Sequence, residues 1–343
     1  MEEAISHFLH GQHLLVLLGV IAIFICTLAH GAHLVVEEAV ILSIKWGVPK
    51  AVIGATIVSL GTTLPEAAVS VFAAIQGNPG LALGNAVGSI ICDTGLIMGL
   101  AIVIGPVSIT RSVVAKQGVI DLAAGFLLVL ACLPFSSLST VFSQGGRLPQ
   151  VMGFIFLGLL AAYLFLSVYW TRNQTLIDDE VPTPSGGKQS KIVSTLVKLF
   201  LGIAIVVVSS QILIPTIEEV AVRLHVPDAI IAATLVAFGT SLPELVTAIS
   251  AVRKRHGELA VGNVIGADIL NVLFVAGAAA SVTGDGLTAP ASFFQILFPG
   301  MIVLLTLFLG GLYFSTDSLK RPLGYGLLLV YVTITVLSYT FGA

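Results

Sequence analysis

Charged residues are scarce in this chain. Aspartate, glutamate, lysine and arginine together make up 10% of its 343 residues, whereas hydrophobic residues make up 57%. A water-soluble domain carries about a quarter charged residues. The composition therefore excludes an ordinary soluble protein and predicts an integral membrane protein surrounded by the lipid bilayer. We expect no nucleic-acid partner.

Cysteines and enzyme motifs are also scarce or absent. The three cysteines all lie in apolar segments and offer no disulfide framework. The sequence contains no His-Glu-x-x-His motif and no serine or cysteine nucleophile beside a plausible base. Residues 1–13 lack the basic region and cleavage site of a signal peptide, so we expect none to be removed. We therefore predict that the protein is not an enzyme and has no cofactor.

Long apolar stretches make up most of what is present. A helix that crosses a bilayer needs about 20 apolar residues, and ten stretches meet this requirement. They lie near 14–35, 48–75, 80–104, 115–134, 149–171, 193–214, 227–252, 259–281, 288–312 and 322–341. The second, third, seventh and eighth are interrupted, so we expect broken helices there. The predicted fold is an all-α polytopic membrane protein with ten transmembrane helices.

The lysines and arginines indicate the orientation of these helices. If ten helices alternate in direction, thirteen basic residues fall on one side of the membrane and only Arg147 and Arg223 fall on the other. Basic residues gather on the cytoplasmic side, so we predict a multi-pass plasma-membrane protein with both termini outside. The thirteen are Lys45, Lys50, Arg111, Lys116, Arg172, Lys188, Lys191, Lys198, Arg253, Lys254, Arg255, Lys320 and Arg321.

The chain contains an internal repeat at an offset of 178 residues. Gly-Thr-Thr-Leu-Pro-Glu at 61–66 matches Gly-Thr-Ser-Leu-Pro-Glu at 239–244, and Gly-Asn-x-x-Gly at 84–88 matches the same pattern at 262–266. Each half holds five predicted helices. Because five is odd, the second copy would enter the membrane from the opposite side, as in transporters built from inverted repeats.

This repeat divides the chain into three predicted parts. We expect a first five-helix repeat at 1–171, a cytoplasmic linker at 172–192 and a second, inverted repeat at 193–343. The linker is rich in polar residues, proline and glycine, including Asp178-Asp179-Glu180, and we interpret it as a flexible connection.

The repeated residues suit a cation. Pro65 and Pro243 interrupt their helices and free backbone carbonyls, which is tolerable in a membrane only where those groups line a cavity or bind something. Thr62 and Glu66 are four residues apart and would share a helix face. The same spacing recurs in the other three segments, and together they supply oxygen ligands, which hard cations such as Ca²⁺ prefer. The candidate ligands are Glu66, Asp93, Glu244 and Asn271, with hydroxyls from Thr62, Thr63, Ser89, Thr240 and Ser241, and with Asp268 beside them.

Each motif also has a purely structural interpretation. A proline can merely kink a helix, and glycines four residues apart, at 84, 88, 262 and 266, can serve close helix packing. Asp268 has an apolar counterpart, Ile90, and could be structural. Acidic residues at 37–38, 121 and 218–219 are interpreted as interfacial charges, with a gate or ion entry path as the alternative.

The two motifs resemble the α-repeats of the cation/Ca²⁺ exchanger superfamily, which carry Gly-[Thr/Ser]-Ser-x-Pro-Glu and then Gly-Asn-x-x-Gly-Ser-Asn-x-x-Asn. The chain looks most like the compact prokaryotic Na⁺/Ca²⁺ exchangers. The resemblance implies exchange of Na⁺ for Ca²⁺ at four clustered sites by a chain that can function as a monomer. It also implies carbonyl ligands at Ser59 and Ala237, one turn before each first motif.

Departures from the family pattern fall inside the second motif. Ile90 replaces the usual asparagine, and Ala267 replaces the usual serine. Asp93 stands where the first repeat commonly has asparagine, and Asn271 stands where the second repeat often has aspartate. The number of central acids is preserved, which favours Ca²⁺ handling, but the missing hydroxyl leaves the counter-ion open. A Ca²⁺/H⁺ or K⁺-coupled exchanger is the alternative, with slight support for H⁺ from His30 and His33. A cation channel is less favoured.

Overall fold

The computed structural model describes residues 11–135, 138–174, 192–223 and 240–341. Within these ranges it is mostly helical, and eight helices are long and apolar enough to cross a membrane, or nine if one bent pair counts as a span. The predicted seventh stretch, 227–252, lies partly outside the described residues. The polytopic helical fold is therefore confirmed, while the count of ten remains a prediction.

The first half of the chain runs from the long helix α2 to α10. Its elements are α2 (Leu14–Trp46), α3 (Lys50–Ile53), the π-helix η1 (Gly54–Val58), α4 (Ser59–Thr62), α5 (Leu64–Ile75), α6 (Pro79–Ile91), the π-helix η2 (Cys92–Ile97), α7 (Met98–Ile104), β1 (Val107–Ser108), α8 (Arg111–Cys132), the 3-10 helix η3 (Leu138–Thr140), α9 (Val141–Gln144), β2 (Gly146–Leu148) and α10 (Gln150–Gln174).

The second half begins with α11. It contains α11 (Ile192–Arg223), α14 (Leu242–Arg253), α15 (Gly257–Leu270), the π-helix η5 (Asn271–Ala276), α16 (Gly277–Ser281), β3 (Leu287–Ala289), the π-helix η6 (Phe293–Leu297), α17 (Phe298–Phe314), β4 (Ser318–Leu319) and α18 (Arg321–Phe341).

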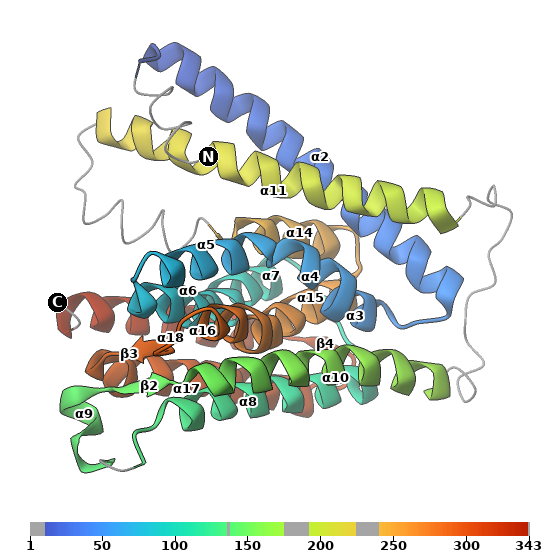
Figure 1. The fold of residues 1–343 in the computed structure, drawn as a ribbon. Helices are drawn as coiled ribbons and strands as arrows, with labels where there is room; N and C mark the ends of the chain where they lie inside the picture. Colours follow the sequence, from blue (N-terminus) through green and yellow to red (C-terminus); the bar gives the residue numbers. More distant parts are fainter. Residues whose placement is uncertain (1–10, 136–137, 175–191, 224–239, 342–343) are drawn as a thin grey trace, which may run out of the picture.

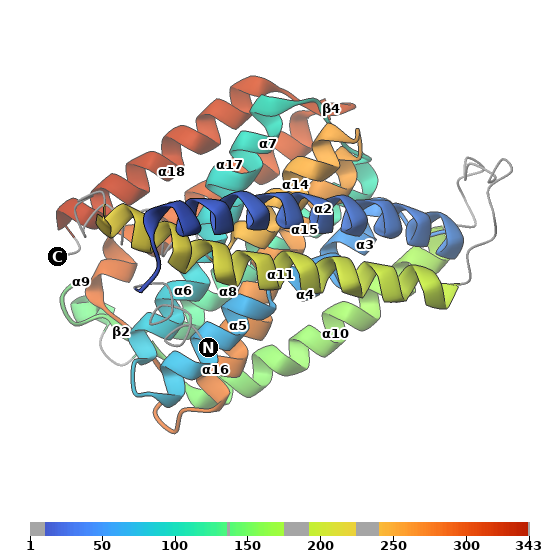
Figure 2. The same ribbon diagram turned by 90° about the horizontal axis from the view of Figure 1, so that it is seen from above.

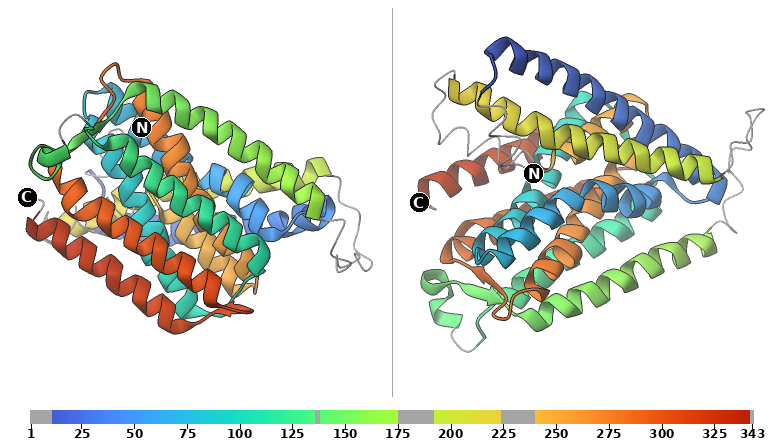
Figure 3. Two further views of the ribbon diagram at one scale, coloured as in Figure 1. Left: turned by 90° about the horizontal axis from the view of Figure 1, so that it is seen from below. Right: turned by 45° about the horizontal axis from the view of Figure 1, so that its top comes forward.

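The helices are arranged in layers around α15. Helices α2 and α11 lie side by side as a pair that covers one face of the bundle (Figures 1 and 2). On the opposite face α8, α17 and α18 pack in a row, and α10 covers α16 (Figure 3). Between these layers α15 packs against η1, α14 and α8. The most apolar part of the span that contains α15 is 94% buried, so this helix is the centre of the core.

The interrupted helices take two forms. The second span bends by 45° between α4 and α5, at Thr63, and Pro65 occupies the first turn of α5. Thr63 (φ −82°, ψ 0°) and its equivalent Ser241 (φ −84°, ψ 11°) adopt the same conformation. This confirms a break before the proline in the second span and indicates the same local geometry at the start of α14.

The third and eighth spans are not broken, which corrects the prediction. Each continues as one helix through a π-helical segment, η2 or η5, that begins near Asp93 or Asn271. These segments contain no proline, so the backbone can widen to i→i+5 hydrogen bonding instead of separating. A further π-helix, η6, lies in the ninth span, where none was predicted.

Short strands add a feature that the all-α prediction lacked. Strand β1 pairs with β4, and β2 pairs with β3, both antiparallel. Each pair joins a loop of one half of the chain to a loop of the other. Strand β1 follows the third span and β3 follows the eighth, yet the two pairs lie at opposite ends of the bundle (Figures 1 and 2). Equivalent loops therefore lie at opposite ends.

The turns that precede α6 and α15 also match. Gly77 has a positive φ of 83°, and Arg255, which is 178 residues later, is the one non-glycine residue with a positive φ, 61°, in the described part of the chain. L-residues rarely adopt this conformation. The repeat thus retains a left-handed turn residue even where the second copy has lost the glycine.

Close backbone packing joins α15 to the second span. An added Cβ at Gly262 would overlap the carbonyl oxygen of Ala51, one at Gly266 would overlap the backbone of Ala55, and one at Gly54 would lie 2.6 Å from the carbonyl oxygen of Leu259. This confirms the packing interpretation for Gly262 and Gly266. Gly84 and Gly88 make no such contact, and the segment that the 178-residue offset would put against them lies outside the described residues.

We predict that Gly262→Ala destabilises the detergent-solubilised protein by about 1–3 kcal/mol, because the new methyl group meets rigid backbone. Thermal melting is the measurement. Gly158→Ala on α10 is the matched control, since an added Cβ there meets nothing within 4 Å. Equal melting temperatures for the two variants would contradict the close packing of α15 on η1.

Candidate functional site

Four predicted ligands lie buried on the irregular parts of the helices. Glu66 in the first turn of α5, Asp93 in η2, Glu244 in the first turn of α14 and Asn271 at the start of η5 are each 1% exposed. Three carboxylates are therefore enclosed within a bundle whose core is largely apolar.

Hydroxyl groups connect the glutamates across the two copies of the repeat. Thr63 Oγ1 donates to Glu244 Oε1 at 3.2 Å, and Ser241 Oγ makes a longer contact of 3.5 Å with Glu66 Oε1. Thr63 is equivalent to Ser241, and Glu66 is equivalent to Glu244. Each hydroxyl thus lies at the end of its own helix and reaches the glutamate of the other copy, so the two motifs form one site.

The acid and the amide of the second motif face each other. Asn271 Nδ2 lies 3.5 Å from Asp93 Oδ2. These residues are equivalent positions of the repeat, so this pair marks the place where the two copies meet.

The predicted helix face shared by Thr62 and Glu66 spans a break in the helix. Thr62 and Glu66 are four residues apart, but the helix is interrupted at Thr63 between them. Thr62 Oγ1 donates to the carbonyl oxygen of Ser59 at 3.3 Å, and the Thr62 side chain also hydrogen-bonds Glu244 of the other copy. Thr240 Oγ1 makes a 3.5 Å contact with Asn85 Oδ1.

The remaining candidates lie in or near this region. Ser59, Thr62, Thr63, Ser89 and Ser241 are all buried, and Thr240 is partly buried. Ser59 Oγ donates to the carbonyl oxygen of Thr56. Ala237, the expected second carbonyl ligand, lies outside the described residues.

Asn85 has a role that the sequence analysis missed. Its Nδ2 group donates to the backbone carbonyl of Glu66 at 3.2 Å and to Ser70 Oγ at 3.0 Å. It therefore holds α6 against the first turn of α5, where Glu66 lies. The sequence does show that Asn85 matches Asn263 in the repeat. We interpreted this match as part of a helix motif and not as a side chain that positions Glu66.

Two further aspartates lie close to the central acids. Asp268 on α15 is fully buried and accepts a short hydrogen bond from Thr94. Asp121 on α8 is 3% exposed, and its charge acts on both Asp93 and Asp268. The interpretation of Asp121 as an interfacial charge is therefore wrong, because α8 packs its acidic residue toward α15.

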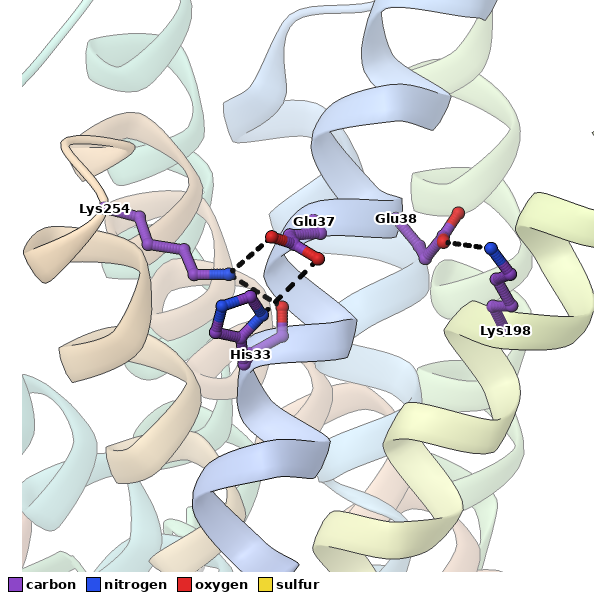
Figure 4. A network of polar contacts seen from close by, with 5 residues as sticks. All are labelled: His33, Glu37, Glu38, Lys198 and Lys254. Carbon is purple, nitrogen blue, oxygen red and sulfur yellow. Dashed lines mark hydrogen bonds and ion pairs between the residues drawn. The ribbon is translucent and has the colours of Figure 1, made fainter. Parts of the chain in front are cut away.

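The acids at the outer ends of the predicted spans are ion-paired. Glu37 lies 3.4 Å from Lys254 and 3.4 Å from His33, and buried Glu38 lies 3.4 Å from Lys198 (Figure 4). Glu219 is also mostly buried and pairs with Arg223 at 2.6 Å. These pairs connect helices or adjacent turns, and the interfacial interpretation of Glu37, Glu38 and Glu219 remains a prediction.

The three central acids and Asp268 share an incomplete hydrogen-bond pattern. Glu66, Asp93, Glu244 and Asp268 each have one carboxylate oxygen that accepts a hydrogen bond and one buried oxygen without a partner. Asn271 Oδ1 is also buried and unpartnered. Among the described residues, none of these carboxylates forms an ion pair with a lysine, arginine or histidine.

Such a set of oxygens fits a cation. Burying an unpaired carboxylate is costly, and a bound cation relieves that cost. No three histidine, cysteine, aspartate or glutamate side chains in the described ranges lie close enough to hold one metal ion by themselves. Hydroxyl, amide and backbone oxygens would therefore complete the coordination, which suits a hard cation rather than a transition metal.

A bundle of apolar helices around buried, unpartnered carboxylate oxygens fits a membrane protein that binds cations. Residues 16–169 and 194–340 match the family model described as sodium/calcium exchanger protein. The chain belongs to this family, and it is a multi-pass transporter rather than an enzyme.

Individual relatives cover most of the chain. The sodium/calcium exchanger MaX1 of Methanosarcina acetivorans is 29% identical and covers 95% of this chain and 98% of its own length. The putative antiporter CaxA of Alkalimonas amylolytica is 32% identical over 70% of this chain and 73% of its own length. The solved structure of the sodium-calcium exchanger NCX_Mj has a TM-score of 0.78 and 25% identity, covering 96% of this chain and 100% of that one.

We predict that Glu66→Gln raises the melting temperature in alkaline buffer without Na⁺ or Ca²⁺, by about 2 °C or more. The substitution removes a buried charge that lacks a cationic partner. Glu37→Gln is the control, because Glu37 is half exposed and ion-paired, so its loss should leave the melting temperature unchanged or lower. A lower melting temperature for Glu66→Gln would indicate that this charge is already compensated within the protein.

Proposed function

We propose that the protein is a secondary antiporter that exchanges Ca²⁺ for Na⁺ across the plasma membrane by alternating access. The observation that carries this proposal is the set of buried, half-satisfied carboxylates at repeat-equivalent positions: Glu66 opposite Glu244, and Asp93 opposite the amide of Asn271. MaX1 and NCX_Mj, which are sodium/calcium exchangers by name, support the choice of ions.

We further propose ten transmembrane helices in two inverted repeats, 1–171 and 193–343, joined by a cytoplasmic linker at 172–192. Three local features support the repeat: the matched conformations of Thr63 and Ser241, the matched left-handed turns at Gly77 and Arg255, and the π-helices η2 and η5. The inversion is supported by equivalent loops at opposite ends of the bundle. Both termini would face outward, and one chain would suffice for transport.

The central oxygens suggest how one site can serve both ions. Ca²⁺ takes six to eight oxygen ligands. Glu66, Glu244 and Asp93 would supply its charged ligands, and Asn271 would supply an amide oxygen. The hydroxyls of Thr62, Thr63, Ser89, Thr240 and Ser241, the carbonyls of Ser59 and Ala237, and Asp268 would complete the Ca²⁺ and Na⁺ sites. Several Na⁺ ions can balance the same carboxylates as one Ca²⁺, so the two ions compete and exchange.

An ion-swap assay tests this function. Purified protein in vesicles should take up Ca²⁺ when Na⁺ leaves the vesicles down its gradient, and Glu244→Gln should abolish that uptake. Glu37→Gln should retain it, which controls for reconstitution. Uptake that ignores the Na⁺ gradient but follows a proton or K⁺ gradient would replace Na⁺ with that counter-ion. Single-channel currents would instead indicate a channel.

The contact between Asp93 and Asn271 generates a second prediction. Asp93→Asn removes one of the three central charges and should reduce Ca²⁺ uptake at least about ten-fold, as expected if roughly 1.4 kcal/mol of ion binding is lost. Adding Asn271→Asp returns the charge to the opposite side of the same contact, so the double variant should recover much of the uptake. Failure of this rescue, with the double variant still folded, would contradict a shared position for the two side chains.

A further inference from the structure

A groove lies between α2 and α14, where the α2–α11 pair meets the core. It has a volume of about 420 Å³ and is lined by one stretch of α2 and one stretch of α14. Its walls are apolar along most of its length, with Ile25, Leu28, Leu245 and Ile249 among the lining residues. Ile25 is 50% exposed, so the groove opens to the surroundings.

Positive charge gathers at one end of this groove. Arg253, Lys254 and His33 line that end. Lys254 contacts Glu37 and donates to the backbone carbonyl of His33, which ties α14 to α2 (Figure 4). Arg253 is exposed and forms no ion pair within the described residues. The groove is therefore apolar along most of its length, and Arg253 places at one end a positive charge without an ion-pair partner among the described residues.

The length of the groove is comparable to the thickness of one leaflet of a bilayer. The lining stretch of α2 from Ile25 to His33 rises about 12 Å at 1.5 Å per residue. One leaflet contributes about 15 Å of hydrocarbon. An acyl chain can fill an apolar groove that opens to the bilayer, and an arginine at its end can bind a lipid phosphate.

We propose that this α2–α14 groove is a binding site for one anionic phospholipid. The acyl chain lies between α2 and α14, and the phosphate is held by Arg253, with Lys254 beside it. The lipid then bridges the α2–α11 pair to the core at the point where Lys254 already joins them. This site is separate from the central oxygens and does not depend on which ions are exchanged.

Native mass spectrometry of purified protein tests the proposal. The protein is exchanged into mixed micelles that contain equal amounts of phosphatidylglycerol and phosphatidylcholine. We expect one tightly retained phosphatidylglycerol per chain. Arg253→Gln should lower its apparent affinity about five-fold, which is the effect of one membrane-adjacent cation. Lys116→Gln, which removes another exposed cation on α8, is the matched control and should leave retention unchanged.

A second pair of variants tests the apolar wall. Ile25→Trp should fill the groove and reduce lipid retention, whereas Ile23→Trp should not. Ile23 is also exposed on α2, by 61%, but does not line the groove. Melting temperatures confirm that each variant is folded. Equal retention of the two lipids, or equal losses in Arg253→Gln and Lys116→Gln, would overturn the proposal and indicate only unspecific annular lipid.

Discussion

A carboxylate enclosed by apolar helices must be compensated by a cation, a proton or hydrogen bonds, because an isolated charge there costs several kcal/mol. In the described part of this chain, hydrogen bonds compensate only one oxygen of Glu66, Asp93 and Glu244. The other structural features hold these half-satisfied groups together. The Thr63 hydroxyl lies at the break in the second span and reaches the second copy of the repeat. Glycines on α15 allow the backbone of the second span to pack directly against the backbone of α15.

The sequence was sufficient to find the central acids, because polar residues stand out in a membrane chain and a repeat doubles the signal. The 178-residue offset identified Glu66 with Glu244 and Asp93 with Asn271, and the prolines predicted the bend of the second span. These features depend on local chemistry. The contacts of Thr63 with Glu244 and of Ser241 with Glu66 are equivalent under the repeat. The sequence alone did not predict either contact.

Features that depend on packing between distant segments were not predictable. Helical spacing suggested that Thr62 faces Glu66, but the hydroxyl that contacts the Glu66 carboxylate is that of Ser241, from the other copy. Asn85 acts on the site through a hydrogen bond to another helix, and buried Asp121 brings a further carboxylate near Asp93. The strand pairs β1–β4 and β2–β3 join loops more than a hundred residues apart, and no local pattern of two or three residues indicates them.

The central claim is that oxygens from both copies form one shared cation site. Equilibrium dialysis of radioactive Ca²⁺ against purified protein, with Glu66→Gln and Glu244→Gln measured separately, tests it most directly. A shared site predicts that either substitution removes all high-affinity Ca²⁺ binding and that Na⁺ displaces Ca²⁺ from the unmodified protein. If each variant instead retained half of the bound Ca²⁺, the two copies would form independent sites, and the account would be wrong.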